Sequence, residues 1–336
     1  MSDSTLAKFL YYLFKCLGLA PLTYGPKKHF RSSKYGLLYS AVLMKCLIAT
    51  NGYAIKVSFE NNRVVQFDRI VDSSRDTIGT VCSILILITF CLQRERSVNL
   101  ANKLKTLYEL LIASEMYLLT KIFKEICILS FFAWLLLLIV PFISNMFRFE
   151  LLLYSVGPYA ADAIITGAML QYSFVLRFVK QLFEIINNNI DRCCLLQSLQ
   201  LKSTQISCAR DVHFALYEFC EQLDKFYSVP MLLSVLYEFV DLVLCSYFTV
   251  KFLLFDRGPI SSVVNEVRVN VILSFDYFYQ SITQYLFLFL KQNKRTGKII
   301  YKWMGNVNGK QITTKIVGSI TTYIVILLQL QSKDRK

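Results

Sequence analysis

Charged residues are scarce in this 336-residue chain: they make up 18% of the sequence, against roughly a quarter in an average soluble domain. Glycine and proline are also few, at 12 and 6, so no flexible linker or low-complexity tract is expected. Hydrophobic residues reach 55%, and the mean hydropathy is +0.45. A single soluble core could not bury so much apolar surface, and a disordered chain would not contain it. The composition therefore indicates a protein that crosses a membrane several times.

The sequence also has little material for catalysis or metal binding. It contains only two histidines, His29 and His213, which lie far apart. Its ten cysteines form no C-x-x-C pair and no spacing of a small disulfide module. There is no G-x-S-x-G, H-E-x-x-H or phosphate-binding glycine loop, and no pair of carboxylates at a catalytic spacing. We therefore expect no enzyme activity, no cofactor and no metal.

The formal net charge is +14. In a soluble protein this excess would suggest a nucleic-acid partner, but in a membrane protein basic residues gather in the cytoplasmic loops. We expect the lipid bilayer, and no nucleic acid, as a partner. The N-terminus does not resemble a signal peptide, because Lys8 and Lys15 interrupt its apolar run. Residues 6–22 are predicted to form an amphipathic helix lying against the inner membrane surface.

Seven stretches are apolar and long enough to span a bilayer as helices. The fold class predicted is an all-α bundle of seven transmembrane helices in one domain, residues 1–336. The long connections 94–125 and 177–228 show helical spacing of apolar residues, so they should continue the bundle as helices outside the lipid. The predicted spans are 36–57, 76–93, 126–146, 151–176, 229–255, 267–290 and 315–331.

Basic residues predict the direction of the chain through the membrane. The segments on the side of the N-terminus carry about three times as many Lys and Arg as those on the other side. This places the N-terminus in the cytoplasm and the C-terminus outside. G-protein-coupled receptors run the opposite way, and their D-R-Y and N-P-x-x-Y motifs are absent from the expected positions.

The last predicted span carries a polar–apolar–polar stripe. Thr322 and Gln329 lie about two turns apart and within about 20° of the same helix face, and Ser319 lies about one turn earlier. Val325 and Ile326 separate them. Such a stripe can hydrogen-bond to a neighbouring helix, or it can line water with the aliphatic pair as a gate. Spacing alone leaves both interpretations open.

The same helix resembles a known family signature. Thr322 and Tyr323, the apolar run 324–328 and then Gln329 are similar to the T-Y, five hydrophobic residues, Q-F motif that closes insect gustatory receptors. Leu330 stands where that family usually has Phe. The segment Cys16–Pro21 resembles the common start of the family, and the span number and direction agree with it.

The resemblance implies a receptor of the insect chemoreceptor superfamily that detects a small-molecule tastant. It implies a ligand-gated, non-selective cation channel, assembled as a homo- or hetero-tetramer with other gustatory receptor subunits. The seventh helix would line the pore, and the protein would lie in the plasma membrane of sensory neurons. The pore-lining and gate residues would be Ser319, Thr322, Val325, Ile326 and Gln329.

Acidic and tyrosine side chains within the predicted spans suggest a ligand pocket in the outer half of the bundle. The alternative is internal pairing of the acids, for instance with Lys45, Lys56 or Lys251. For Glu238 and Asp241, expected near the middle or the inner side, internal pairing is favoured. The pocket candidates are Tyr159, Asp162, Tyr247, Asp276, Tyr277 and Tyr279.

Two other functions remain as alternatives. An odorant receptor subunit of the same superfamily would share the topology and the gating. A secondary transporter would fit less well, because transporters usually show two related halves, whereas this chain has an odd number of predicted spans and no evident repeat.

Overall fold

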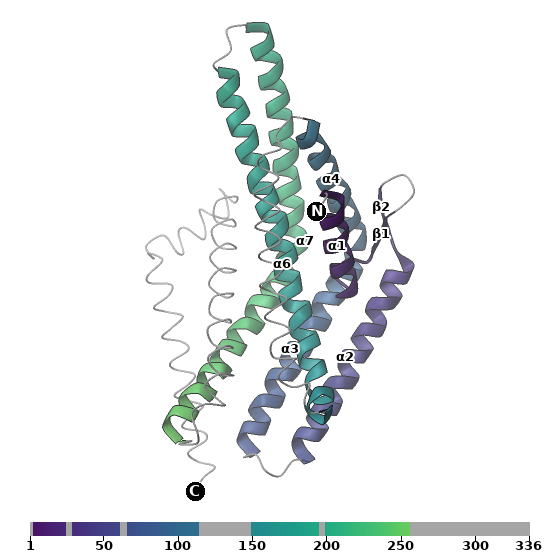
Figure 1. The fold of residues 1–336 in the computed structure, drawn as a ribbon, viewed down its shortest axis with the longest axis vertical. Coiled ribbons are helices and arrows are strands. Elements are labelled where there is room, and N and C mark those ends of the chain that lie inside the picture. Colours follow the sequence, from purple (N-terminus) through teal and green to yellow (C-terminus); the bar gives the residue numbers. More distant parts are fainter. Residues whose placement is uncertain (1–2, 25–28, 61–65, 114–148, 195–198, 256–336) are drawn as a thin grey trace. The chain divides into compact units, whose positions relative to one another are not determined.

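The computed structural model describes residues 3–24, 29–60, 66–113, 149–194 and 199–255 (Figure 1). They fall into two compact units. Unit 1 comprises Met1–Ala54 and Thr80–Ser234, and unit 2 comprises Ile55–Gly79 and Val235–Lys336. The elements are α1 (Asp3–Cys16), β1 (Leu22–Tyr24), β2 (Phe30–Ser32), α2 (Lys34–Glu60), α3 (Gln66–Leu92), α4 (Arg94–Ala113), α6 (Phe149–Cys194) and α7 (Leu199–Phe255).

Three helices in the described part of the chain are long and apolar enough to cross a membrane: Lys34–Glu60, Ser73–Leu92 and Arg210–Leu244. They coincide with or overlap the predicted spans 36–57, 76–93 and 229–255. The predicted span 151–176 lies within α6, which is not one of these three. The predicted spans 126–146, 267–290 and 315–331 lie outside the described residues. The number of seven transmembrane spans and the direction of the chain through the membrane therefore remain predictions.

Helix α2 shows the reversed polarity of a lipid-facing helix. Its buried residues are mostly small or polar: Gly36, Ser40, Asn51 and Ala54, together with Leu47. Large apolar side chains are exposed instead, among them Tyr35, Leu38, Val42 and Ile48. A water-soluble helix would have the opposite pattern, whereas in a membrane small residues mark the contacts between helices.

Glycines on α6 allow α2 and the segment after α1 to approach closely within unit 1. A Cβ atom on Gly157 would come within 2.7 Å of the Thr50 Oγ1 on α2. A Cβ on Gly167 would come within 2.6 Å of Leu17, whose neighbour Gly18 lies against Ser40 of α2. Later positions on α6 thus meet earlier positions on α2, so the two helices are antiparallel.

The first helix is shorter than the predicted 6–22, because α1 ends at Cys16. Gly18 has φ of 75°, a left-handed conformation that favours glycine. The amide of Gly18 donates to the Lys15 carbonyl and the amide of Leu19 to that of Phe14, which is the hydrogen-bond pattern of a Schellman motif. The chain then turns back, and residues 22–24 form a strand instead of a further helical turn.

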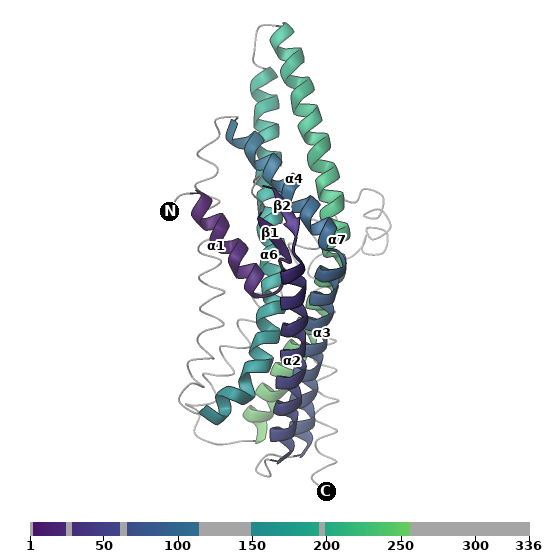
Figure 2. The same cartoon turned by 90° about the vertical axis from the view of Figure 1, so that its right-hand side faces the viewer.

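A small antiparallel hairpin, β1–β2, packs beside α4 in unit 1 (Figure 2). The side chain of Asn102 on α4 pairs with Phe30 like the backbone of a third strand. Its Oδ1 accepts the Phe30 amide at 2.8 Å, and its Nδ2 donates to the Phe30 carbonyl at 3.1 Å. After the hairpin, Ser33 caps α2 by accepting the Gly36 amide at 3.0 Å.

The long connections are helical, as predicted. Helix α4 covers most of the connection 94–125. In the connection 177–228, α6 continues to Cys194 and α7 begins at Leu199. Within unit 1, α6 runs beside the first part of α7 in both views (Figures 1 and 2). Phe183 of α6 contacts His213 of α7, with ring centroids 5.4 Å apart.

Replacing Asn102 by Leu should release the hairpin from α4, because both hydrogen bonds to Phe30 are lost. Each bond contributes about 1 kcal/mol, so hydrogen exchange in the hairpin should accelerate by roughly tenfold or more. Hydrogen–deuterium exchange of the peptide containing Phe30 measures this. Asn99, exposed on the same helix, offers the matched control Asn99→Leu. Equal exchange in both variants would contradict the bridging role of Asn102.

Candidate functional site

The predicted gate lies outside the described residues, so its pore-lining role remains a prediction. The same holds for three of the six pocket candidates. The residues concerned are Ser319, Thr322, Tyr323, Val325, Ile326, Gln329 and Leu330 of the last span, and Asp276, Tyr277 and Tyr279 of the sixth.

Two pocket candidates, Tyr159 and Asp162, lie about one turn apart on α6 in unit 1, and both are half-buried. The backbone carbonyl of Asp162 accepts a hydrogen bond of 2.6 Å from the Thr166 hydroxyl. The third described candidate, Tyr247, belongs to unit 2 and is fully buried on α7.

An aromatic cluster joins α3, α6 and α7 within unit 1. The Phe90 ring meets the Phe226 ring edge-on, with centroids 5.2 Å apart, and lies 5.9 Å from the Tyr227 ring. Tyr227 in turn lies 5.0 Å from Tyr172 of α6. All four side chains are buried, so they form part of the packed interior of this unit. The sequence did not predict this cluster, because its members are distant along the chain.

Unit 2 contains an ion pair between α3 and α7. The Arg75 Nε donates to the Asp241 Oδ1 at 2.5 Å. The Asp241 side chain is only 10% exposed and that of Arg75 27%. Such a pair is held out of bulk water, so each partner compensates the charge of the other.

A glycine contact lies next to this ion pair in unit 2. Gly79 is one turn after Arg75 on α3, and Tyr237 is one turn before Asp241 on α7. A Cβ on Gly79 would lie only 2.8 Å from the Tyr237 ring, so glycine leaves room for the buried tyrosine. From the first contact to the second, the residue numbers rise along α3 and fall along α7, so the two segments are antiparallel. Glu238 is also buried on this part of α7.

The internal pairing favoured for Asp241 is confirmed, with Arg75 as its partner and not one of the lysines named as examples. Asp241 pairs with Arg75, whereas Lys56 pairs with Glu60 on the same exposed surface of α2 at 3.8 Å. Arg75 lies just before the predicted span 76–93, so hydropathy alone does not indicate it as a partner within the helix bundle. The polar residues before that span are in fact helical, since α3 begins at Gln66. If the helix is extended before residue 76, Arg75 lies one turn before Gly79 on the same helix. This extension is the signal that could have indicated Arg75 as a partner of an acid on another helix.

Within the described ranges, no three His, Cys, Asp or Glu side chains come close enough to hold a metal ion. The described site is thus polar and aromatic: it contains a partly buried ion pair, buried tyrosines and an additional acid on antiparallel helices. It offers charged and hydrogen-bonding groups within an apolar setting.

Long apolar helices, small residues at their contacts and a partly buried ion pair together define a helical membrane protein. A family model described as 7tm chemosensory receptor matches residues 7–308. The chain therefore belongs to the seven-transmembrane chemosensory receptor family, as its resemblance to insect gustatory receptors indicated. A search of curated proteins found no match. The family consists of receptors rather than enzymes, and it supports binding of a small molecule and a location in a membrane.

Removing one partner of the Arg75–Asp241 pair should destabilise the protein, because the remaining charge loses a close opposite charge in a partly buried position. We expect Asp241→Asn or Arg75→Gln to lower the free energy of unfolding by about 3 kcal/mol each. The double variant should cost less than the two single variants combined. Thermal unfolding of the purified full chain measures these differences.

The exposed Lys56–Glu60 pair supplies the control for the double-mutant cycle of Arg75 and Asp241. Its side chains are 71% and 66% exposed, so Glu60→Gln should change stability by less than about 0.5 kcal/mol. Strictly additive effects of Asp241→Asn and Arg75→Gln would contradict a direct interaction between them.

Proposed function

We propose that this chemosensory receptor is a gustatory receptor that acts as a ligand-gated, non-selective cation channel. The observation that carries the proposal is the C-terminal signature: Thr322 and Tyr323, an apolar run, and then Gln329. The family membership supports the receptor role, and the signature favours the gustatory over the odorant branch. The match ends at residue 308, so the signature is separate support.

In the proposed topology the N-terminus lies in the cytoplasm and the C-terminus outside. Helix α3 then enters the membrane from the outer face, so Arg75 lies near that face. Asp241, as its partner, lies at the same level. This differs from the middle or inner position expected from the sequence. The buried polar residues of unit 2 thereby fall in the outer half of the membrane, where a ligand from outside would bind.

The proposed ligand is a small-molecule tastant bound in the outer half. The candidate tyrosine walls and acidic anchors in unit 2 are Tyr247, Asp276, Tyr277 and Tyr279, and the candidates in unit 1 are Tyr159 and Asp162. The ligand opens the channel only if it binds the open state more tightly than the closed state, by a few kcal/mol for a decisive shift. Four subunits, of this chain alone or with other gustatory subunits, would surround the pore in the plasma membrane of sensory neurons.

Whole-cell recording from cells that express the full chain tests the proposal. We expect sugars, bitter alkaloids or cuticular lipids in a panel to evoke a cation current. Saturable uptake of a ligand without current would indicate a transporter and contradict the proposal. Recording with co-expressed gustatory subunits covers a hetero-tetramer, and the absence of current under both conditions would also count against a channel.

Substitutions in the last span should change the pore without removing the protein from the surface. Ile326→Ala should widen the proposed constriction and raise the basal leak, because a smaller apolar side chain favours wetting. Gln329→Ala should change permeation. Surface labelling and current–voltage relations measure both effects. Unchanged currents in both variants would contradict the pore assignment.

The matched control is a double substitution in the proposed pocket, Asp276→Asn with Tyr277→Phe. This variant should change the response to ligand and leave the conductance as it is. Altered conductance with a normal response would contradict the assignment of these residues to the pocket.

A further inference from the structure

A proline interrupts the backbone hydrogen bonding of α6. Pro158 lies inside this helix. Proline has no backbone N–H, so the carbonyl of residue 154, four positions earlier, receives no hydrogen bond from within the helix. In a membrane there is no bulk solvent to replace that bond, and neighbouring side chains or ordered water satisfy such a carbonyl. The groups around Pro158 therefore decide how the carbonyl of residue 154 is satisfied.

Helix α2 lies against this part of α6 within unit 1. A Cβ atom on Gly157 would come within 2.7 Å of the Thr50 Oγ1 and within 3.3 Å of the Thr50 carbonyl carbon. That carbon belongs to the peptide bond between Thr50 and Asn51, so Asn51 lies beside Gly157. The Thr50 hydroxyl already donates to carbonyls of its own helix, at 2.9 and 3.1 Å. Asn51 is therefore the polar side chain of α2 best placed to serve the region of Pro158.

The alignment of α2 with α3 brings Thr80 opposite Asn51. The side chain of Cys91 on α3 lies within hydrogen-bonding reach of Ser40 on α2. Asn51 follows Ser40 by eleven residues, and Thr80 precedes Cys91 by eleven. Eleven residues make about three helical turns, so both residues return to the faces that meet at Ser40 and Cys91. Because only residues 61–65 connect the two helices, they run antiparallel, and the two positions lie at the same level.

A second contact supports this alignment. A Cβ atom on Gly18 would come within 2.9 Å of the Leu87 Cδ2 on α3 and within 3.3 Å of the Leu43 Cδ2 on α2, so these two leucines are neighbours. Asn51 lies eight residues after Leu43, and Thr80 lies seven residues before Leu87. Both separations are about two turns, which again brings Asn51 and Thr80 to facing positions.

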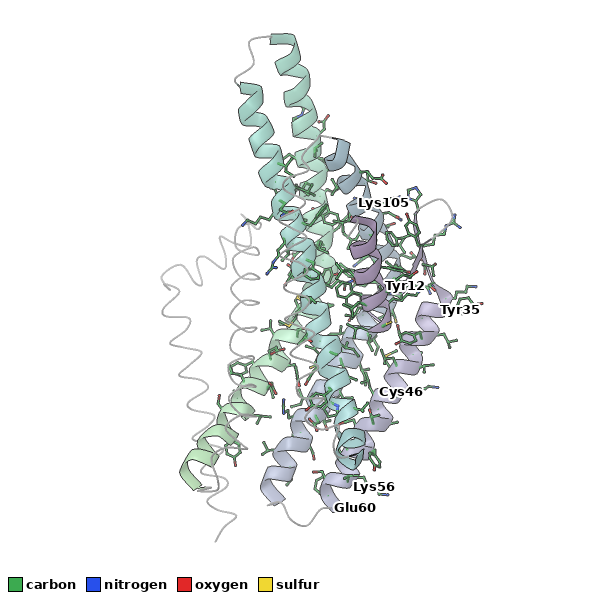
Figure 3. The ribbon with its side chains drawn as sticks, viewed as in Figure 1. Tyr12, Tyr35, Cys46, Lys56, Glu60 and Lys105 are labelled. Atoms are coloured by element: carbon green, nitrogen blue, oxygen red, sulfur yellow. The ribbon has the colours of Figure 1, made fainter. Side chains whose placement is uncertain are left out.

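The side chains of Asn51 and Thr80 are buried on the inner sides of their helices. They are 8% and 3% exposed, whereas Tyr35 and Cys46 of α2 point away from the neighbouring helices of unit 1 (Figure 3). Within the residues that the structure describes, the Asn51 Oδ1 and the Thr80 Oγ1 have no hydrogen-bond partner. A buried polar atom without a bond is costly, and ordered water commonly joins such atoms.

We propose that Asn51, Thr80 and the carbonyl of residue 154 bind an ordered water molecule beside Pro158. The water donates its two hydrogens to the Asn51 Oδ1 and to the carbonyl oxygen, and it accepts the hydrogen of the Thr80 hydroxyl. Three hydrogen bonds are typical of a buried water. All three groups are uncharged, which suits a neutral molecule. The site joins α2, α3 and α6 within unit 1, and it goes beyond the proposed function because it requires neither a ligand nor a channel.

X-ray footprinting of the full chain in lipid nanodiscs tests this site. Irradiation produces hydroxyl radicals from water, and a water held in the interior oxidises the side chains beside it. We expect oxidation at Leu47, which is 2% exposed and lies one turn before Asn51, as read by mass spectrometry. Thr80→Val should lower this yield about threefold or more, because the water loses one of its three bonds. Thr80→Ser keeps the hydroxyl and should preserve the yield.

The matched control is Thr89→Val on the same helix. The Thr89 hydroxyl donates to the carbonyl of Leu85 in its own helix at 2.8 Å, so its loss should leave the oxidation of Leu47 unchanged. Cryo-electron microscopy of the unsubstituted chain gives a measurement that does not depend on the folding of any variant. Density within about 3 Å of all three oxygens is expected. Equal oxidation in Thr80→Val and Thr89→Val, or a direct bond between Thr80 and Asn51 without this density, would overturn the proposal.

Discussion

The structure depends on one constraint: in the hydrocarbon core, helices must hold together without the hydrophobic effect between them. Close approach of backbones supplies the attraction instead. In unit 1, Gly157 and Gly167 let α6 contact Thr50 and Leu17, and in unit 2 Gly79 admits the ring of Tyr237. The reversed polarity of α2, with small residues inside and large apolar residues outside, follows from the same constraint.

Within the described residues, three of the predicted spans coincide with or overlap helices able to cross a membrane, because length and hydropathy decide whether a segment can do so. The prediction 36–57 lies within α2 (Lys34–Glu60), and the helical spacing after Leu92 corresponds to α4. The predicted span 76–93 agrees within three residues with the apolar part of α3, Ser73–Leu92, while the helix itself begins earlier, at Gln66. A span predicted from hydropathy begins where the polar residues end. Residues 66–75 are polar in part but still helical, and Arg75 pairs with an acid on another helix.

Long-range pairing is what the sequence alone could not show. The β1–β2 hairpin has strands of three residues each, too short for an alternating pattern, and its link to α4 depends on Asn102. The partner of Asp241 is likewise set by how α3 and α7 align. The cost of a buried charge predicts that Asp241 pairs with a base inside the protein. Only the arrangement of α3 beside α7 identifies that base as Arg75. The aromatic cluster around Phe90 was hidden for the same reason.

The bond between Asn102 and Phe30 has a consequence for the order of biosynthesis. The two residues are separated in the chain by α2 and α3, two helices able to cross a membrane. A ribosome therefore releases Phe30 long before Asn102, and the hairpin waits with its outer edge open. Its completion requires that both helices be threaded and that α4 return to the starting side. The hydrogen bonds between Phe30 and Asn102 can therefore form only after α2 and α3 have been synthesised.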